Sequence, residues 1–226
     1  TAEADATVAV VSDQDGSLGT TTADGNGDWS FAPGSALSEG THSLTAKVTD
    51  AAGNTAPSSA DLSLTVDTTA PPAPATPDLD AGSDSGGSST DDVTSETMPT
   101  LSGTAEAGAT VEVVSDPDGS LGAVTADGSG DWSFTPGAAL SEGTHSLTVT
   151  ATDAAGNTGP SSSSLSVTVD TTAPSAPSAP DLAVASDTGS SSTDDLTSDD
   201  TPALSGTVEA DATVAVVSDL DGSLGT

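Results

Sequence analysis

The side chains in this sequence that could do chemistry are carboxylates. Of its 35 acidic residues, 28 are Asp and seven are Glu, against one basic side chain, Lys47. Most Asp residues stand beside Gly, Ser, Thr or another Asp, which are typical neighbours in turns and loops. Like charges at contact distance cost about 1–4 kcal/mol per pair at effective dielectric constants from water to a partly buried site. Clustered loop carboxylates therefore indicate a missing cation.

One such cluster is the segment 78–92, where five Asp residues fall among Gly and Ser residues that let a loop curl. Asp80 is replaced by Ala183 one repeat later, so it is not expected to be an essential ligand. Carboxylate oxygens suit Ca²⁺, a hard ion that takes six to eight oxygen ligands. A flexible, solvated loop is the alternative. The predicted ligands are Asp84, Asp91 and Asp92, with Asp187, Asp194 and Asp195 as their counterparts.

The net charge of −34 excludes several classes of function. A chain with one Lys and no Arg cannot neutralise a phosphate backbone, so no nucleic-acid partner is expected. It cannot dock on an anionic membrane through basic residues, and its longest apolar runs are too short to span a bilayer, so no direct membrane insertion is expected. Without Cys there are no disulfides or thiolate metal sites.

The elements that must position these carboxylates follow from a repeat of 103 residues. Thr1-Ala2-Glu3-Ala4 returns as Thr104-Ala105-Glu106-Ala107, and about three-quarters of the positions match between the first two copies without a gap. A repeat of this length is a whole domain rather than one turn of a solenoid.

Within a repeat the hydrophobic pattern alternates with a period of two, which predicts strands. Dipeptides such as Asp118-Gly119 predict the turns between them, and no helical stripe is present. About seven short strands per hundred residues predict an all-β fold of tandem immunoglobulin-like Greek-key β-sandwich domains in a linear array. The predicted strands are 110–114, 123–125, 132–134, 146–151 and 165–169.

A Pro-rich joint, Asp67-Thr68-Thr69-Ala70-Pro71, marks the domain boundaries and recurs at residues 170–174. Pro fixes its own φ and restricts the residue before it, so the joint should be short and stiff. We therefore expect a partial domain over residues 1–66 without its first strands, a complete domain over 67–169, and the first strands of another over 170–226.

In such a sandwich the chain enters at the same end as the loops after the second and before the last strand. This would bring Asp67, Glu106, Asp153 and Asn157 together at one boundary, as a second candidate calcium site. The equivalents at the next boundary are Asp170 and Glu209. The alternative is that Asp67 and Asp153 cap turns through their own backbone, as Asx residues do.

Other motifs favour structural roles. Asp13-Gln14-Asp15-Gly16 and Asp24-Gly25-Asn26-Gly27-Asp28 resemble the opening of an EF-hand loop. A loop that starts at Asp24 would need a Glu where Ser35 stands, and the flanking helices of an EF-hand are absent, so hairpin turns are expected. His42 and His145 have no evident partners and are expected at the surface or at an edge. The alternating aromatic residues predict core filling. No serine nucleophile motif or phosphate loop is present, so the chain is not expected to be an enzyme. The aromatic residues concerned are Trp29, Phe31, Trp132 and Phe134.

Six segments carry a resemblance to a known family, and they are 66–71, 84–86, 90–94, 100–108, 130–134 and 152–157. In these segments the chain resembles the bacterial Ig-like domain repeats of giant type I-secreted adhesins and biofilm-associated proteins. The resemblance implies an extracellular spacer on the bacterial cell surface that contacts neighbouring repeats of the same chain and binds calcium at and near its joints.

Four functional hypotheses follow. The first is a calcium-stiffened spacer that supports adhesion and biofilm formation. The second is a self-assembling filament subunit, in which partial domains are completed by other copies of the chain. A carbohydrate-binding module is third. Halophilic adaptation is fourth, but the location of the Asp residues in loops argues against it, since that hypothesis predicts acids scattered over strands with Glu well represented.

Overall fold

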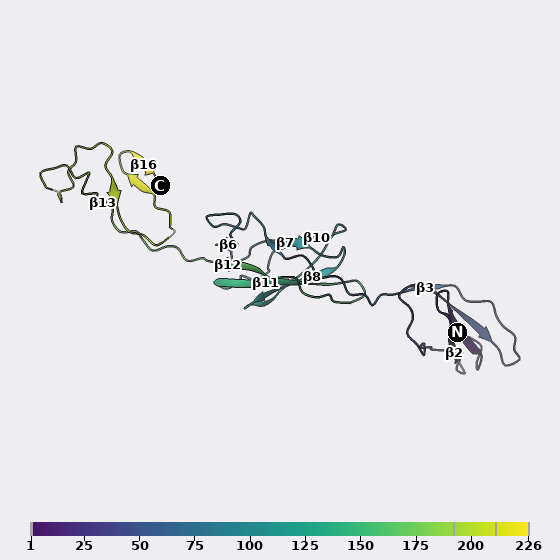
Figure 1. Cartoon of the computed structure of the whole chain (residues 1–226). Helices are drawn as coiled ribbons and strands as arrows, with labels where there is room; N and C mark the ends of the chain where they lie inside the picture. Colours follow the sequence, from purple (N-terminus) through teal and green to yellow (C-terminus); the bar gives the residue numbers. More distant parts are fainter. Residues whose placement is uncertain (1, 192, 211, 226) are drawn as a thin grey trace. The chain divides into compact units, whose positions relative to one another are not determined.

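The computed structural model describes residues 2–191, 193–210 and 212–225, and all of its regular elements are strands (Figure 1). The chain forms two compact units, residues 1–170 and 171–226, which are described separately below. Among the described residues no helix is long and apolar enough to cross a membrane.

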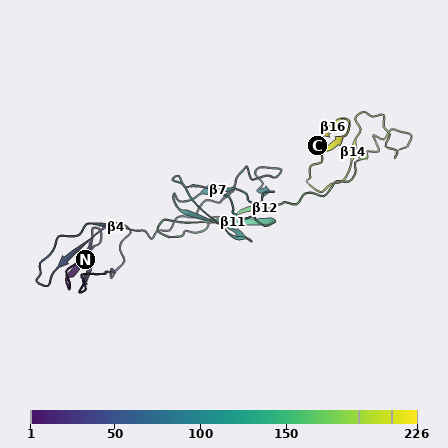
Figure 2. The same cartoon turned by 180° about the vertical axis from the view of Figure 1, so that it is seen from behind.

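Residues 78–169 form a two-layer sandwich. Figures 1 and 2 show β7 in one layer and β11 and β12 in the other. One sheet has the order β10-β7-β5, and the other has the order β6-β12-β11-β8-β9, with β6 parallel to β12. The strands are β5 (Asp78–Leu79), β6 (Val93–Thr94), β7 (Leu101–Thr104), β8 (Thr110–Asp116), β9 (Gly119–Thr125), β10 (Asp131–Phe134), β11 (Gly143–Thr152) and β12 (Leu165–Val169).

The sandwich follows from the alternation of the sequence. Every second side chain of β8 and β11 is buried between the layers, and the residues between them on the outer face are polar except for Val114. The short sheet contributes Leu79, Leu101, Trp132 and Phe134 to the same core. The predicted all-β, Ig-like fold is confirmed, and the five predicted strands lie within β8 to β12.

The first repeat carries only one of these layers. Its strands form a sheet of order β2-β1-β3-β4, equivalent to β9-β8-β11-β12. Residues 28–31, equivalent to β10, are not a strand, because residues 1–66 contain no equivalent of β7 for them to pair with. Trp29 is consequently 39% exposed, whereas Trp132 is 4% exposed, so the expectation that Trp29 fills a core is wrong here. The strands are β1 (Thr7–Ser12), β2 (Gly16–Thr22), β3 (Gly40–Thr49) and β4 (Leu62–Val66).

The second unit has two short antiparallel ladders. β13 (Asp181–Leu182) pairs with β14 (Leu204–Ser205) in the register that β5 and β7 have one repeat earlier. β15 (Val216–Ser218) pairs with β16 (Gly222–Gly225). The expected hairpin turns after Asp13 and Asp118 are also present, because Ser12 pairs with Gly16 and Ser115 with Gly119.

Candidate functional site

The loop before the last strand of the complete domain is closed by Asp153. One carboxylate oxygen, Oδ1, accepts hydrogen bonds from the N–H groups of Ala155 at 2.8 Å and Asn157 at 2.9 Å. The other oxygen accepts one from the Asn157 side-chain amide at 2.8 Å. These hydrogen bonds, that of the Asn157 side chain first, hold the pKa of Asp153 below its usual value. Asp153 therefore caps an Asx turn, the alternative that the sequence left open.

The same Asn157 amide reaches the joint. Its Nδ2 donates to the main-chain oxygen of Asp67 at 3.0 Å, and the Asp67 carboxylate accepts the N–H of Thr69 at 3.1 Å. Asn157 thus contacts both Asp153 and Asp67, and the atom of Asp67 that it contacts is the main-chain oxygen. The exposed Glu106 side chain takes no part in these hydrogen bonds within the described part of the chain.

Sequence reasoning missed Glu39, which holds the joint from the side of the first repeat. Its carboxylate accepts the N–H of Thr68 at 3.0 Å, the Thr68 hydroxyl at 2.7 Å and the Thr69 hydroxyl at 3.3 Å. The Thr68 hydrogen bonds are the main cause that lowers the pKa of Glu39. A usable signal existed, because two of only seven Glu residues, Glu39 and Glu142, occupy this repeat position.

Pro71 anchors the other end of the joint in the complete domain. It is fully buried, and a Cβ added to Gly159 would overlap the Pro71 carbonyl oxygen. Residues 67–71 are therefore held from both sides, by Glu39 of the first repeat and by Asn157 and Gly159 of the second. This joint is a packed, hydrogen-bonded segment rather than a free linker.

The equivalent boundary residues further along fall in the two separate units. The N–H of Asp170 donates to the carbonyl of Thr94 at 2.9 Å in the first unit. In the second unit the Glu209 carboxylate accepts the N–H of Ser175 at 3.1 Å.

The acidic loop of residues 80–92 contains a buried carboxylate with an unsatisfied oxygen. Asp84 is only 7% exposed, and its Oδ1 has no hydrogen-bond partner in the described structure. Leaving a buried charged oxygen unpaired is costly. The loop is held in place by the Thr94 hydroxyl, which donates to the Ser83 carbonyl at 2.6 Å.

Asp92 lies close enough to Asp84 to be affected by its charge. Its pKa is raised, first by desolvation and then by the charges of Asp84, Asp78 and Asp91. Its backbone has a positive φ of 57°, a conformation that costs energy in residues other than Gly. The three predicted ligands Asp84, Asp91 and Asp92 therefore lie in one region of negative electrostatic potential.

The third repeat builds the same loop. Asp187 Oδ1 is buried without a partner, and Asp195 has a φ of 54°. Asp194 Oδ1 accepts the N–H of Leu196 at 3.4 Å, as Asp91 Oδ1 accepts that of Val93 at 3.3 Å. The same unsatisfied oxygen at the same repeat position in two separate units is a property of the sequence pattern.

A hard cation fits this donor set, because the buried Oδ1 of Asp84 is an anionic oxygen that lacks a partner. Among the described residues, however, no three Asp, Glu or His side chains are already grouped so that they could hold a metal ion.

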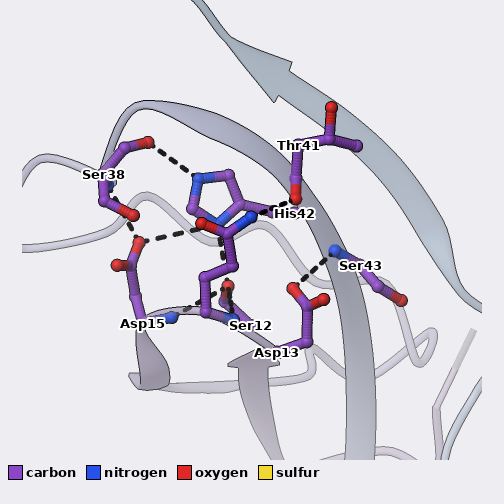
Figure 3. Close-up of polar contacts among 8 residues, drawn as sticks. Ser12, Asp13, Asp15, Ser38, Thr41, His42 and Ser43 are labelled. Atoms are coloured by element: carbon purple, nitrogen blue, oxygen red, sulfur yellow. Dashed lines mark hydrogen bonds and ion pairs between the residues drawn. The ribbon is translucent and has the colours of Figure 1, made fainter.

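His42 and His145 are fully buried, so the expectation that they lie at the surface is wrong. Figure 3 shows His42 between Ser12 and Ser38. Its Nδ1 lies 2.9 Å from Ser12 Oγ and its Nε2 lies 2.8 Å from the Ser38 carbonyl. Ser12 Oγ accepts the N–H groups of Gln14 and Asp15, which leaves its own proton for His42 Nδ1. Through these two hydrogen bonds the imidazole holds the loop that precedes β3 in place.

The second repeat has the same arrangement, in which His145 contacts Ser115 Oγ at 2.8 Å and the Ser141 carbonyl at 2.8 Å. The Asp118 carboxylate lies 3.4 Å from His145 Nδ1. Ser, His and Asp are together, but they cannot act as a nucleophilic triad. A triad needs Ser and Asp on opposite ring nitrogens, whereas both lie at Nδ1 here and Nε2 is occupied by a carbonyl.

The chain was compared with known proteins. No curated protein matches it. The solved structures that resemble it include the fibronectin(III)-like modules of Clostridium thermocellum CbhA, with 16% identity over 75% of this chain and 80% of that one and a TM-score of 0.43. A Ca²⁺-stabilized adhesin with which an Antarctic bacterium binds ice is 29% identical over 75% of this chain and 42% of that one, with a TM-score of 0.37. A biofilm associated protein (BSP domain) is 25% identical over 76% of this chain and 26% of that one, with a TM-score of 0.31.

The chain spans less than half the length of the last two structures. The model of a family described as the bacterial Ig-like domain matches residues 1–68, 70–171 and 173–226, which is nearly the whole chain. This family is structural and non-enzymatic. The chain belongs to the bacterial Ig-like domain family.

Proposed function

We propose that this chain is a spacer segment of a large bacterial cell-surface adhesin, in which tandem Ig-like domains are kept stiff by their joints. The observation that carries the proposal is that residues 67–71 are hydrogen-bonded from both domains, by Glu39 on one side and by Asn157 on the other. A spacer transmits position only if its joints resist bending, and a joint held from both domains meets that requirement. An extracellular location and a role in adhesion and biofilm formation belong to the same proposal.

Calcium is the second part of the proposal. The residues that would hold it are Asp84, Asp91 and Asp92, with Asp187, Asp194 and Asp195 one repeat later. When bound, the ion would supply positive charge to oxygens that otherwise repel. The loop also touches the exit of the domain, since Asp92 O accepts the N–H of Thr168 at 2.9 Å and Thr94 O accepts that of Asp170 at 2.9 Å. Ordering the loop therefore orders the start of the next joint.

The joint residues Asp67, Glu106, Asp153 and Asn157 form the second proposed calcium site. Asp67 already satisfies one carboxylate oxygen within its own turn, and Asp153 satisfies both of its oxygens. Both carboxylates keep lone pairs for a cation, because ionised carboxylates offer about four acceptor positions. Glu39 joins this set, since the hydrogen bonds with Thr68 and Thr69 place its carboxylate at the joint.

The calcium proposal is tested by calorimetric titration of the whole chain with CaCl₂. We expect heat of binding in the unsubstituted chain, and loss of one class of sites in Asp84→Asn. The matched control is Asp80→Ala, which copies the third repeat, where Ala183 occupies this position; it should bind as the unsubstituted chain does. Absence of binding heat, or equal binding by Asp84→Asn and the control, would overturn the assignment.

The spacer proposal is tested separately by small-angle scattering. The maximum dimension and the melting temperature should both fall when calcium is replaced by EGTA. If neither quantity changes, the ion does not stiffen the chain.

A carbohydrate-binding module is less well supported, because Trp132 is buried in the core and is therefore not available to stack on a sugar.

A further inference from the structure

The chain enters and leaves the complete domain at opposite ends of β11. At the entrance, the Asp67 carbonyl accepts the side-chain amide of Asn157, in the loop that follows β11. At the exit, Asp170 follows Val169, which is paired with Gly143 at the start of β11. A pull on the two joints of this domain therefore acts along its strands.

The exit strand is bonded to a strand that runs in the same direction. β6 is parallel to β12, where the N–H of Thr168 donates to the Asp92 carbonyl and the N–H of Asp170 donates to the Thr94 carbonyl, both at 2.9 Å. A pull toward the entrance acts on the N-terminal end of β6, and a pull toward the exit acts on the C-terminal end of β12. Because the two strands are parallel, these pulls slide one past the other and load all of the hydrogen bonds between them at once.

These hydrogen bonds are shielded from water. Thr94 and Val169 are both 1% exposed, and Val167 is fully buried. A hydrogen bond in dry surroundings is stronger than an exposed one, and it opens less readily. Asp92, which supplies one of the acceptors, has a φ of 57°, a conformation that a residue other than Gly keeps only where its surroundings hold it.

The acidic loop 80–92 determines whether a pull reaches β6. If this loop were extended, its 13 residues would give about 40 Å of slack between β5 and β6. The loop instead folds back on β6, since the N–H of Gly86 donates to the Val93 carbonyl at 3.1 Å. A Cβ on Gly86 would lie 2.9 Å from that carbonyl oxygen, so the loop comes this close only because the position is Gly.

Hydroxyl groups fasten the same loop to β6. The N–H of Ser95 donates to Ser85 Oγ at 2.8 Å, and Ser85 Oγ lies 3.2 Å from Thr94 Oγ1. The Thr94 hydroxyl in turn donates to the Ser83 carbonyl at 2.6 Å. The loop is therefore shortened by hydrogen bonds at several points and holds little slack.

The third repeat fastens its loop in the same way. The N–H of Gly189 donates to the Leu196 carbonyl at 3.0 Å, and the N–H of Ser198 donates to Thr188 Oγ1 at 2.8 Å. Thr188 keeps the hydroxyl although the residue type differs from that in the second repeat, so the fastening is a property of the repeat. The counterparts in the complete domain are Gly86, Val93, Ser95 and Ser85.

We propose that the loop 80–92 and the parallel pair β6–β12 form a mechanical clamp, which sets the force at which the complete domain opens when the chain is pulled from its two joints. The fastened loop passes the pull from β5 to β6, and the sliding of β6 against β12 is then the first step of unfolding. The inference rests on the proposed spacer function, since a spacer carries tension along its chain. It concerns the resistance of the domain itself, whereas the spacer proposal concerns the bending of its joints.

The test measures the lifetime of the complete domain at constant force in single molecules of the whole chain. The sequence contains no Cys, so the force can be applied through Ala70→Cys and Ala173→Cys, two exposed residues at the same position of consecutive joints. A second attachment uses Ala138→Cys in place of Ala70→Cys. Ala138 is exposed and precedes β11, whose first residue pairs with the last residue of β12.

The second attachment pulls apart the paired ends of the antiparallel strands β11 and β12, so their hydrogen bonds break one after another. At the same force we expect the domain to open about tenfold faster or more than it does when pulled from its joints, because fewer hydrogen bonds must break together. Equal lifetimes in the two directions would overturn the proposal.

Loop variants test the fastening of the clamp. With the joint attachment, Ser85→Ala should shorten the lifetime about three- to tenfold, because it removes the acceptor of the Ser95 N–H. The matched control is Ser88→Ala in the same loop, since the Ser88 hydroxyl lies 3.0 Å from Thr90 Oγ1 within the loop. This control should keep the lifetime within about twofold of the unsubstituted chain. The same lifetime for both variants would contradict the role of the loop.

A core variant should show the opposite pattern. Val113 on β8 is fully buried, so Val113→Ala should lower the urea midpoint more than Ser85→Ala does. Its lifetime under force should nevertheless stay within about threefold, because the contacts of β8 are still formed when the clamp breaks. If Val113→Ala shortens the lifetime more than Ser85→Ala does, the parallel pair does not set the opening force.

The lifetimes are compared within one buffer, so that calcium does not enter the comparison. Failure of the clamp would leave the scattering result for the spacer unchanged, and the spacer function would stand. An unchanged maximum dimension in EGTA, together with lifetimes that depend on the direction of pulling, would count against the spacer function and support the clamp.

Discussion

Asn157 and Asp67 are joined by a hydrogen bond of 3.0 Å from the Asn157 amide to the Asp67 carbonyl, across 90 residues of chain. The same amide nitrogen also donates to Asp153 within its own loop. One side chain therefore closes the last-hairpin loop and holds the segment that enters the domain. The joint depends on a residue that is otherwise an ordinary turn asparagine.

The first prediction concerns this bond. Asn157→Ala should broaden the distance distribution between nitroxide labels on Ser17→Cys and Ser129→Cys, because the joint loses its anchor to the complete domain. The control is Asn54→Ala. Asn54 in the first repeat donates to Asp50 at 2.7 Å, as Asn157 does to Asp153 at 2.8 Å. Pulsed electron resonance measures the widths, and equal broadening by both substitutions would contradict the role of Asn157.

The second prediction concerns the core. Gly103→Ala should destabilise the complete domain by about 1–3 kcal/mol, because its Cβ meets the Trp132 ring at 2.6 Å. Gly206→Ala is the matched control, since no aromatic ring lies beside it. Urea unfolding followed by far-ultraviolet circular dichroism gives both values, because residues 171–226 contain no Trp to report on Gly206→Ala. The account of the core would fail if Gly103→Ala proved neutral.

The third prediction concerns the buried imidazole. Ser115→Ala should cost about 1–3 kcal/mol of unfolding free energy, because it leaves His145 Nδ1 buried without its donor. Ser120→Ala, which removes an exposed hydrogen bond to Glu112, should change stability by no more than about 0.5 kcal/mol. The comparison is made by chemical denaturation at neutral pH. A Ser115→Ala protein as stable as the control would contradict the role of the network.

The fourth prediction concerns acid stability. The N–H of Ser141 donates to Asp118 at 3.0 Å and is the main cause that lowers the pKa of this carboxyl below its ordinary value of 3.8. A carboxyl with a lowered pKa in the fold stabilises it above the unfolded-state pKa, and this contribution is lost as the pH falls through the lower folded-state value. Melting temperatures from pH 6 to about pH 2 should therefore fall less steeply for Asp118→Asn. Parallel curves for the two proteins would contradict the assignment.

Much of the fold was predictable because it is encoded locally. Alternation in residues such as Val111, Val113, Leu147 and Val149 marks the inner faces, and Asp-Gly turns mark the hairpins. The short strands β5 and β6 have no such signal, since two residues cannot show a period. They exist because they pair with distant partners, as Thr94 does with Val169.

The errors concern residues whose environment comes from distant parts of the chain. The sequence around His145 gives no sign of a hydrogen-bond partner, because Ser115 lies 30 residues away along the chain. Only the fold shows that the buried imidazole has a partner there. Trp29 has the same local sequence as Trp132, yet its burial depends on strands that residues 1–66 do not contain. Glu39 was missed for a related reason, since its partners Thr68 and Thr69 become neighbours only when β3 pairs with β4.

The most direct test of the spacer account is the label distance between Ser17→Cys and Ser129→Cys in an otherwise unsubstituted chain, measured in calcium and again in EGTA. A stiff joint predicts one narrow distribution in calcium that broadens when the ion is removed. A broad distribution in calcium, no narrower than in EGTA, would contradict it.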